Sequence, residues 1–304
     1  MATDGEALTL SVEEAAVYDR QIRLWGADAQ QRMSTSRVLV LGRVRSNLGN
    51  ELIKNICLAG VSSIILCSVN DVQGQGFLGD SLDEVRNSVQ DINRFVKVEI
   101  LEGEEAAANA VESSTAVCLV GFDSLPSIMS IAKSCRKGGI GLFVGECIGL
   151  FGAAYFDLGV RSYAEEDKDS GKLIQKVIDY PSYADTFDDT GVPKAPKTPG
   201  AIALGEMLRL KSNSSEDVEE LTVSYARAVA ETYERTGVGG KQRHSEQHLR
   251  SFAHAARTEV PPVSAIVGGI YGREVIKYLT GKDEPLNNLF FFDAIRSAGI
   301  VECM

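Results

Sequence analysis

Two arginines in the segment YDRQIRLWG, residues 18–26, could contribute to phosphate chemistry. Upstream, Ser11 and Glu14 have the spacing of a capping box, which predicts that a helix begins directly after Ser11. At about 100° per residue, Arg20 points about 200° away from Tyr18 and Arg23 about 140° away. Apolar residues recur every three or four positions and predict one continuous stripe along this helix: Ala15, Tyr18, Ile22, Trp25, Ala29 and Met33.

The two arginines therefore have two interpretations. The simpler one is an ordinary solvated residue on the polar side of an amphipathic helix. The other is an arginine finger, whose planar and permanently charged guanidinium binds a phosphate. Periodicity alone does not decide whether Arg20 or Arg23 would be the finger.

The turn GRVRSNLGNE, residues 42–51, follows a short apolar segment and occupies the place where nucleotide-binding folds grip phosphate. Such a loop needs closely spaced glycines, which let the backbone approach the phosphate. Here Gly42 and Gly49 are seven residues apart. We therefore interpret this segment as a structural strand-to-helix turn, and the alternative is that Arg43 and Arg45 grip a phosphate.

The end of the second predicted strand, in LCSVND, lacks a well-placed acid that could contact a ribose. Ser68 and Asn70 occupy the matching positions, and Asp71 comes late. The following stretch carries no lysine or arginine before Arg86. Because an ATP–Mg²⁺ site needs cations for the phosphates and a carboxylate for the metal, this pocket is predicted to have lost most of its nucleotide contacts.

Cys147 and the three histidines are the remaining candidates for chemistry. No histidine lies within 90 residues of Cys147 to act as its base, so a buried thiol is the favoured interpretation. His244, His248 and His254 are predicted to lie on one polar, solvated helix. No CxxC pair is present, and the sequence predicts no metal site in this chain.

Strands and helices alternate through the first half of the sequence, which predicts an α/β fold with a doubly wound, Rossmann-like and mostly parallel sheet. Residues 149–159 predict an antiparallel extension, 161–200 an irregular mobile connection, and 201–257 additional helices. A helix over 261–281 and two closing strands complete the chain. The predicted parallel strands are 37–42, 63–68, 96–101, 116–121 and 141–145, with helices at 48–60, 81–94 and 124–137.

The chain is predicted to divide into an N-terminal adenylation-type part (1–160), a variable connection with a helical insertion (161–257) and a C-terminal part that completes the domain (258–304).

A net charge of −11 argues against nucleic acid or an anionic membrane surface as a partner. The N-terminus lacks the pattern of a signal peptide, and no segment approaches the ~20 apolar residues of a membrane span. These features predict a reducing compartment.

Two motifs carry a resemblance to a known family. The segment YDRQIRLWG resembles the opening signature of the eukaryotic enzymes that activate ubiquitin-like modifiers. The segments PPVSAIVGGIYGREVIKYLTG and NNLFFFDAIRSAGIVEC resemble the C-terminal end of the smaller, Aos-type subunits of SUMO-activating enzymes. The resemblance covers roughly residues 11–160 and 258–304.

The resemblance implies a pseudo-active subunit in a heterodimer. In this family the larger subunit binds ATP, Mg²⁺ and the modifier's C-terminal glycine, and it forms the thioester. The first arginine of YDRQIR, here Arg20, reaches across to the ATP phosphates of that partner. The resemblance also implies no cofactor in this chain, only indirect contact with the SUMO-type modifier, and a nuclear location with the cytoplasm as a second compartment.

Three alternatives stay open from the sequence. The chain could be the regulatory subunit of a Nedd8-type enzyme, although such subunits are typically far longer. It could be a self-sufficient homodimeric adenylating enzyme of the ThiF or MoeB kind, against which the depleted pocket argues. It could also be a binding module or an NAD-dependent protein with a degenerate loop.

Overall fold

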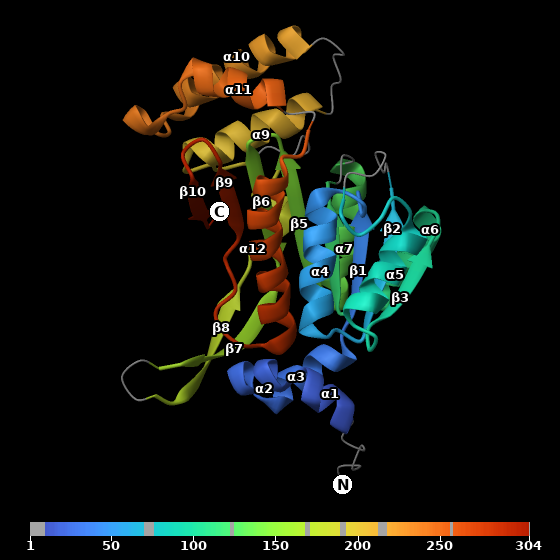
Figure 1. Ribbon diagram of the computed structural model, residues 1–304. Helices are drawn as coiled ribbons and strands as arrows, with labels where there is room; N and C mark the ends of the chain where they lie inside the picture. The colour runs from blue at the N-terminus through green and yellow to red at the C-terminus, as the bar shows by residue number, and fades with distance from the viewer. Residues whose placement is uncertain are drawn as a thin grey trace.

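The computed structural model describes residues 10–69, 76–121, 125–167, 171–188, 193–211, 218–255 and 258–303. Its centre is an eight-stranded sheet in the order β10-β9-β6-β5-β4-β1-β2-β3 (Figure 1). A separate two-stranded sheet of β7 and β8 lies at one end of the molecule, beside the N-terminal helices (Figure 1). The predicted α/β class with a mostly parallel sheet and an antiparallel extension is confirmed.

Five neighbouring strands of the large sheet are parallel, and three antiparallel strands extend it. All of the parallel strands except the edge strand β3 have near-continuous apolar sequences, because helices cover both faces of the sheet. The parallel strands are β1 (Arg37–Gly42), β2 (Ser63–Ser68), β3 (Lys97–Leu101), β4 (Ala116–Val120) and β5 (Gly141–Ile148), and the extension is β6 (Phe151–Asp157), β9 (Leu289–Asp293) and β10 (Ala298–Glu302).

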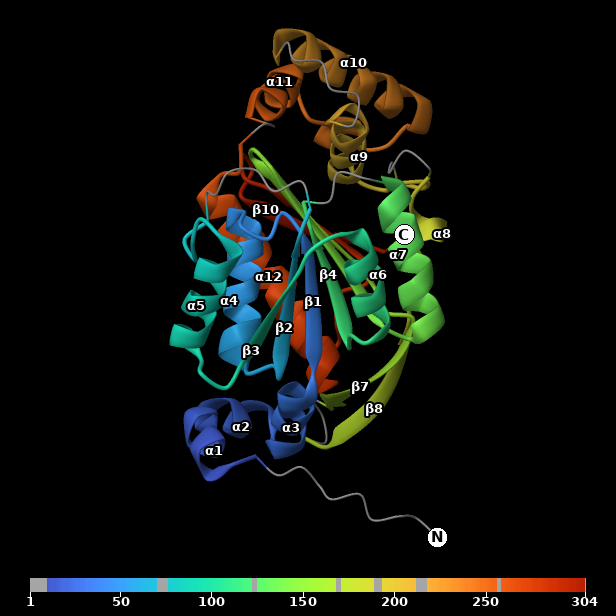
Figure 2. The ribbon, with the colours of Figure 1, turned by 90° about the vertical axis from the view of Figure 1, so that its right-hand side faces the viewer.

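Helices α4 (Asn47–Ala59), α5 (Leu82–Ile92) and α12 (Pro261–Thr280) cover one face of the sheet, and α6 (Glu104–Glu112) and α7 (Leu125–Gly138) cover the other (Figure 2). Glycines let α4 and α12 approach closely: a Cβ atom on Gly268 would lie 2.6 Å from Cβ of Glu51. Tyr271 of α12 is fully buried against the sheet and donates a hydrogen bond to the carbonyl of Phe143, 2.9 Å away.

The predicted single N-terminal helix is wrong. The chain forms three short helices instead, α1 (Val12–Val17), α2 (Asp19–Trp25) and α3 (Ala27–Thr35). The capping box at Ser11 is present, but Gly26 has φ of +90° and ends α2. Tyr18 separates α1 from α2. Since Tyr18, Ala29 and Met33 are buried, these members of the predicted stripe do face inward.

The prediction of an irregular, mobile connection over 161–200 is also wrong. The segment contains the hairpin strands β7 (Val160–Glu166) and β8 (Leu173–Asp179), the short helix α8 (Tyr183–Thr186) and the start of α9 (Pro199–Lys211). The hairpin is largely exposed, so its sequence mixes polar with aliphatic residues and lacks the apolar runs of a buried strand.

A helical cap of α9, α10 (Val218–Thr236) and α11 (Glu246–Ala255) lies at the far end of the molecule from α1–α3 (Figure 1). His244 precedes α11 and is buried, so the prediction of three solvated histidines on one helix is wrong for this residue. Its Nε2 lies 3.1 Å from Oδ2 of Asp293, and its Nδ1 lies 2.8 Å from the hydroxyl of Tyr233. These contacts tie the cap to β9.

Among the described residues, none of the helices combines the length and apolarity needed to cross a membrane. Within the same residues, no cluster of histidine, cysteine, aspartate and glutamate side chains could hold a metal ion. The division of the chain at residues 160 and 257 stays a prediction.

Candidate functional site

Tyr18 anchors the segment that carries the candidate arginine. Its side chain is 2% exposed and fills the space above Gly60, where a Cβ atom would lie 2.5 Å from the tyrosine ring. Burial raises the pKa of the Tyr18 hydroxyl, and the amide of Asn93 donates a hydrogen bond to it over 2.9 Å. Helices α1 and α2 contain no buried residues of their own, so Tyr18 between them is their main attachment to the core.

Arg20 lies one residue into α2 and is exposed. Across the described parts of the chain, no hydrogen bond or ion pair engages its guanidinium. Arg23, by contrast, pairs with Asp19 at 3.1 Å in an exposed pair four residues apart, which is the ordinary surface role predicted for it. Arg20 is thus available to a ligand outside this chain's own contacts.

The other polar residues of this segment fix the direction of α2. Gln21 donates a hydrogen bond to the carbonyl of Leu58, and the indole nitrogen of Trp25 donates one to Gln30 over 3.1 Å. Gln30 is fully buried and donates in turn to the carbonyl of Ala59, 3.0 Å away. Side chains on both sides of Arg20 therefore hold its helix against the end of α4.

Arg20 and the chain's own nucleotide crevice lie at opposite ends of the sheet. In doubly wound folds the ligand crevice lies beyond the carboxyl ends of the strands. Helix α3 leads directly into the amino end of β1, so α2 lies at the amino edge (Figure 1). The six residues of β1 span roughly 20 Å at about 3.3 Å per residue. A side chain on α2 cannot reach across that distance, so Arg20 has no access to this crevice.

An internal ion pair fills one side of the crevice. Arg43, which follows β1, donates from Nε to the carbonyl of Gly121, 3.0 Å away, and forms a salt bridge with Glu146. Their side chains are only 12% and 8% exposed. Gly121 has φ of +57°, and a Cβ atom there would lie 2.1 Å from Nε of Arg43. The arginine that could have gripped a phosphate is held by the protein itself.

The N-terminus of α4 is capped by side chains of this chain. The hydroxyl of Ser46 accepts a hydrogen bond from the backbone of Gly49 over 3.1 Å, and the carboxylate of Glu259 accepts one from Leu48 over 3.2 Å. In a nucleotide-binding fold these backbone groups face a phosphate. Here Ser46 and Glu259 occupy that position, and Arg45 is engaged with the carbonyl of Asp80.

Cys147 is a buried thiol, as predicted. Burial raises its pKa well above the usual value, and the neighbouring carboxylate of Glu259 raises it further, so the thiol stays protonated at neutral pH. At the end of β2, Ser68 is partly buried, whereas Asn70 and Asp71 lie outside the described residues. The interpretation of the ribose position therefore stays a prediction.

Sequence reasoning missed the two carboxylates that close the crevice. Glu146 follows the glycine that ends the predicted strand GLFVG, and Glu259 stands two residues before the pair of prolines that begins α12. Neither position matches a motif, because both approach the turn after β1 only in the folded chain. The only sequence signal for Glu146 was a charged residue directly after a predicted apolar strand.

Replacing Glu259 with glutamine is expected to stabilise the protein increasingly as the pH rises above about 4, the pKa of an unperturbed glutamate. Burial raises the pKa of Glu259, and the hydrogen bond from Leu48 and the charge of Arg43 only partly offset this. A carboxyl whose folded-state pKa is raised stabilises the fold below its unfolded pKa and loses that contribution as the pH rises through its folded pKa. Urea unfolding at several pH values measures the difference.

The exposed Glu112→Gln variant is the control for removing one negative charge. A Glu259→Gln difference that is the same at every pH, or that matches the Glu112→Gln difference throughout, would contradict the buried carboxylate.

Sequence comparison places the chain among known proteins. SUMO-activating enzyme subunit 1 of Xenopus laevis is 30% identical over 345 residues, which cover 98% of this chain and 98% of the relative. The chain belongs to the family of SUMO-activating enzyme subunit 1. The human family member is 30% identical over 341 residues, covering 97% of this chain and 96% of that protein. Subunit 1B-1 of Arabidopsis thaliana is 30% identical over 319 residues, covering 98% of each.

Solved structures resemble this member of the subunit 1 family at the level of the fold. MccB of E. coli superposes with a TM-score of 0.55 at 11% identity, over 95% of this chain and 71% of MccB. PaaA superposes with a TM-score of 0.57 at 14% identity, over 99% of this chain and 77% of PaaA. These likenesses show a shared fold, in agreement with the sheet described above. No family model matches the sequence.

Proposed function

We propose that this chain is the non-catalytic subunit of a heterodimeric SUMO-activating enzyme. It supplies one half of the paired adenylation domains, and it supplies Arg20 to the ATP bound by the larger subunit. Adenylation of the modifier's C-terminal carboxylate and formation of the thioester both occur on that partner.

The position of Arg20 is the observation that carries this proposal. The residue is exposed, its helix is held by Tyr18, Gln21 and Trp25, and it lies at the opposite edge of the sheet from the crevice of its own chain. A phosphate for Arg20 must therefore belong to another polypeptide. The family's smaller subunits, which this chain resembles in YDRQIR, use the matching arginine in this way.

The closed crevice supports the non-catalytic role. A nucleotide there would have to displace Glu259 from the N-terminus of α4 and break the buried pair of Arg43 and Glu146. Removing one member of such a pair leaves an uncompensated buried charge, which typically costs about 3–5 kcal/mol. The crevice also brings two carboxylates to the place where phosphates would add further negative charge. These residues do not fit ATP.

The chemistry assigned to Arg20 is electrostatic. In adenylation, an oxygen of the modifier's carboxylate bonds to the α-phosphorus of ATP, and pyrophosphate leaves with the electrons of the broken bond. Negative charge shifts onto the leaving phosphates as that bond breaks. A guanidinium donates two parallel hydrogen bonds to phosphate oxygens and stabilises this charge. Mg²⁺ neutralises part of the same charge and belongs with ATP on the larger subunit.

The proposal also covers the modifier and the location of the protein in the cell. The SUMO-type modifier contacts this chain only indirectly, because its C-terminal glycine binds to the larger subunit. A nuclear location, with the cytoplasm as a second compartment, follows from the family resemblance. Fluorescence microscopy of the tagged chain tests the location independently of activity.

Pyrophosphate exchange into ATP tests the proposed division of labour. The purified chain alone is expected to give no exchange, because its crevice is occupied by its own side chains. The complex with the larger subunit and a SUMO-type modifier is expected to exchange readily. Robust exchange by the chain alone would contradict the proposal and favour the homodimeric ThiF or MoeB type, and exchange that requires a Nedd8-type modifier would favour the other heterodimer.

A further inference from the structure

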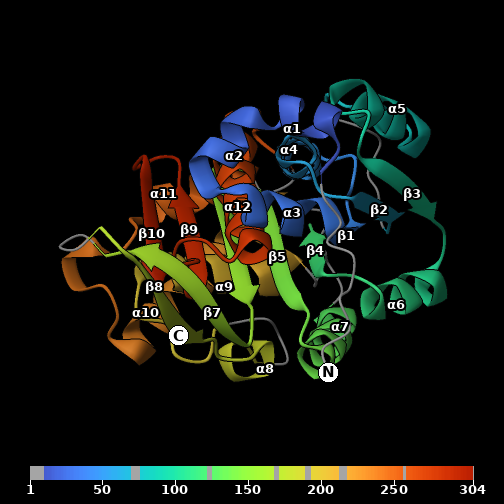
Figure 3. The same cartoon turned by 90° about the horizontal axis from the view of Figure 1, so that it is seen from below.

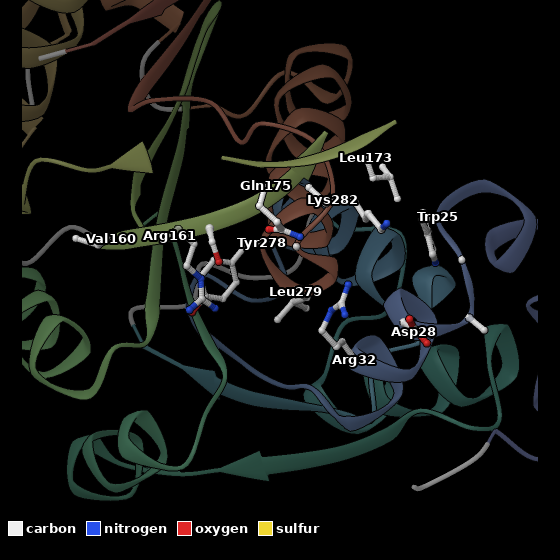
Figure 4. A pocket seen from close by; sticks show the side chains of 15 residues that line it. Trp25, Asp28, Arg32, Val160, Arg161, Leu173, Gln175, Tyr278, Leu279 and Lys282 are labelled. Atoms are coloured by element: carbon white, nitrogen blue, oxygen red, sulfur yellow. The ribbon is translucent and has the colours of Figure 1, made fainter. Parts of the chain in front are cut away.

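A groove of about 630 Å³ lies beside the helix that carries Arg20. It runs between the β7–β8 hairpin, the corner between α2 and α3, and the C-terminal end of α12 (Figure 4). Seen from below, α1–α3 and the hairpin lie on the same side of the molecule (Figure 3), and Figure 1 shows both at the opposite end from the helical cap. The side chains that line the groove include Trp25, Asp28, Arg32, Arg161, Leu173, Gln175, Tyr278, Leu279 and Lys282.

The hairpin presents aliphatic side chains on the side that faces the groove. Val160 and Leu173 line it and are 68% and 63% exposed. Val177 is 69% exposed and pairs directly with Ser162, another lining residue, so it lies on the same face. Three large aliphatic residues this exposed on one short hairpin form a surface that gains free energy when another chain covers it.

The groove is positively charged although the whole chain carries a net charge of −11. Three cations, Arg32, Arg161 and Lys282, line it against the single acid Asp28. Contacts with α12 hold two of these cations in place. Nε of Arg32 donates to the carbonyl of Thr280 over 2.8 Å, and Cζ of Arg161 lies 4.1 Å from the centre of the Tyr278 ring. The charge of the groove is therefore complementary to an acidic ligand.

Strand β8 also offers a free backbone edge. The N–H and C=O groups of Ala164 in β7 bond to Gly281 and Asp283, at 2.9 Å and 3.0 Å, so they point away from β8. Gln175, which pairs with Ala164, consequently directs its own backbone groups away from β7. Residues two positions apart in a strand direct their backbone groups to the same side, so the backbone groups of Leu173 and Val177 also point away from β7. Among the described strands none pairs with that edge, which is suited to the addition of an extended peptide.

We propose that this groove binds an extended, acidic segment of the larger subunit with alternating aliphatic side chains, which lies along the free edge of β8. The identity of the partner rests on the proposed function. The segment's aliphatic residues cover Leu173 and Val177, and its carboxylates face Arg161 and Lys282. Trp25 lines the groove and stands on the same helix as Arg20, so the groove and Arg20 can face the same partner.

The test measures the dissociation constant of the heterodimer by isothermal titration calorimetry. The double variant Leu173→Ser with Val177→Ser and the single variant Lys282→Glu are each expected to weaken binding about tenfold or more. At saturating larger subunit, both variants should adenylate the modifier at the wild-type rate, because Arg20 is intact. Ile92→Ser, which changes a 38% exposed aliphatic on α5, is the matched control and should bind normally.

The possible outcomes separate the proposed groove from a loss of stability and from another occupant. Thermal melting of the variants should match the wild type, since the replaced side chains are exposed or half-exposed. Wild-type affinity in both groove variants overturns the inference while leaving the proposed function standing. A wild-type homodimer that the double variant dissociates also overturns it, because a second copy would then occupy the groove. Failure of the wild-type chain to bind the larger subunit at all contradicts the proposed function itself, and this partner with it.

Discussion

Arg20→Ala in the assembled heterodimer is expected to slow adenylation about 10²–10³-fold while assembly stays normal. Loss of one preorganised donor to a developing charge typically costs about 3–4 kcal/mol of transition-state stabilisation. Arg20 is exposed and makes no contact that holds the described fold together, so its removal should not affect folding. Single-turnover formation of the modifier adenylate, at saturating larger subunit, measures the rate.

Arg23→Ala is the matched control, because it removes the same charge from the same helix and breaks only an exposed pair with Asp19. It should keep close to the wild-type rate. Arg20→Lys should recover little of the loss, since an ammonium lacks the planar fork that binds phosphate in two places. Wild-type adenylation by the Arg20→Ala complex would refute the role of this residue.

Tyr18→Ala is expected to be nearly as damaging, through the position of Arg20. Loss of a buried aromatic side chain typically costs about 3–5 kcal/mol. Because α1 and α2 have no buried residues of their own, this cost falls on their attachment to α4. Helix α2 should then separate from the core, and adenylation should fall toward the rate of Arg20→Ala. Limited proteolysis within residues 18–26 reports the separation directly.

Two further variants distinguish positioning from a general loss of stability. Tyr18→Phe keeps the ring above Gly60 and loses only the hydrogen bond from Asn93, so it should retain most activity and cost about 1 kcal/mol. Tyr18→Ala should also have little additional effect on the rate when Arg20 is already alanine, because both changes act through one guanidinium. Fully additive losses would show that Tyr18 acts by another route.

Local sequence signals predicted most of the secondary structure of the sheet and its flanking helices. The apolar segments RVLVLG and SIILCS form strands with the predicted bounds, and Gly60 ends the helix between them. These predictions succeeded because buried parallel strands and glycine-terminated helices depend on residues close together in the sequence. The exposed hairpin over 160–179 was missed because each of its faces mixes aliphatic with polar side chains, so its pairing leaves little trace in hydrophobic periodicity.

For the candidate site, too, local features could be predicted from the sequence and long-range contacts could not. The sequence by itself identified Arg20 as lying off the apolar stripe and showed that the turn after β1 lacks closely spaced glycines, since both features are local. Only the tertiary structure decided that Glu146 and Glu259 close the crevice, because they reach it from residues about 100 and 210 positions away from the turn. Likewise, only the fold separates Arg20 from its own crevice by the length of β1, because a distance across a sheet depends on topology and not on spacing along the chain.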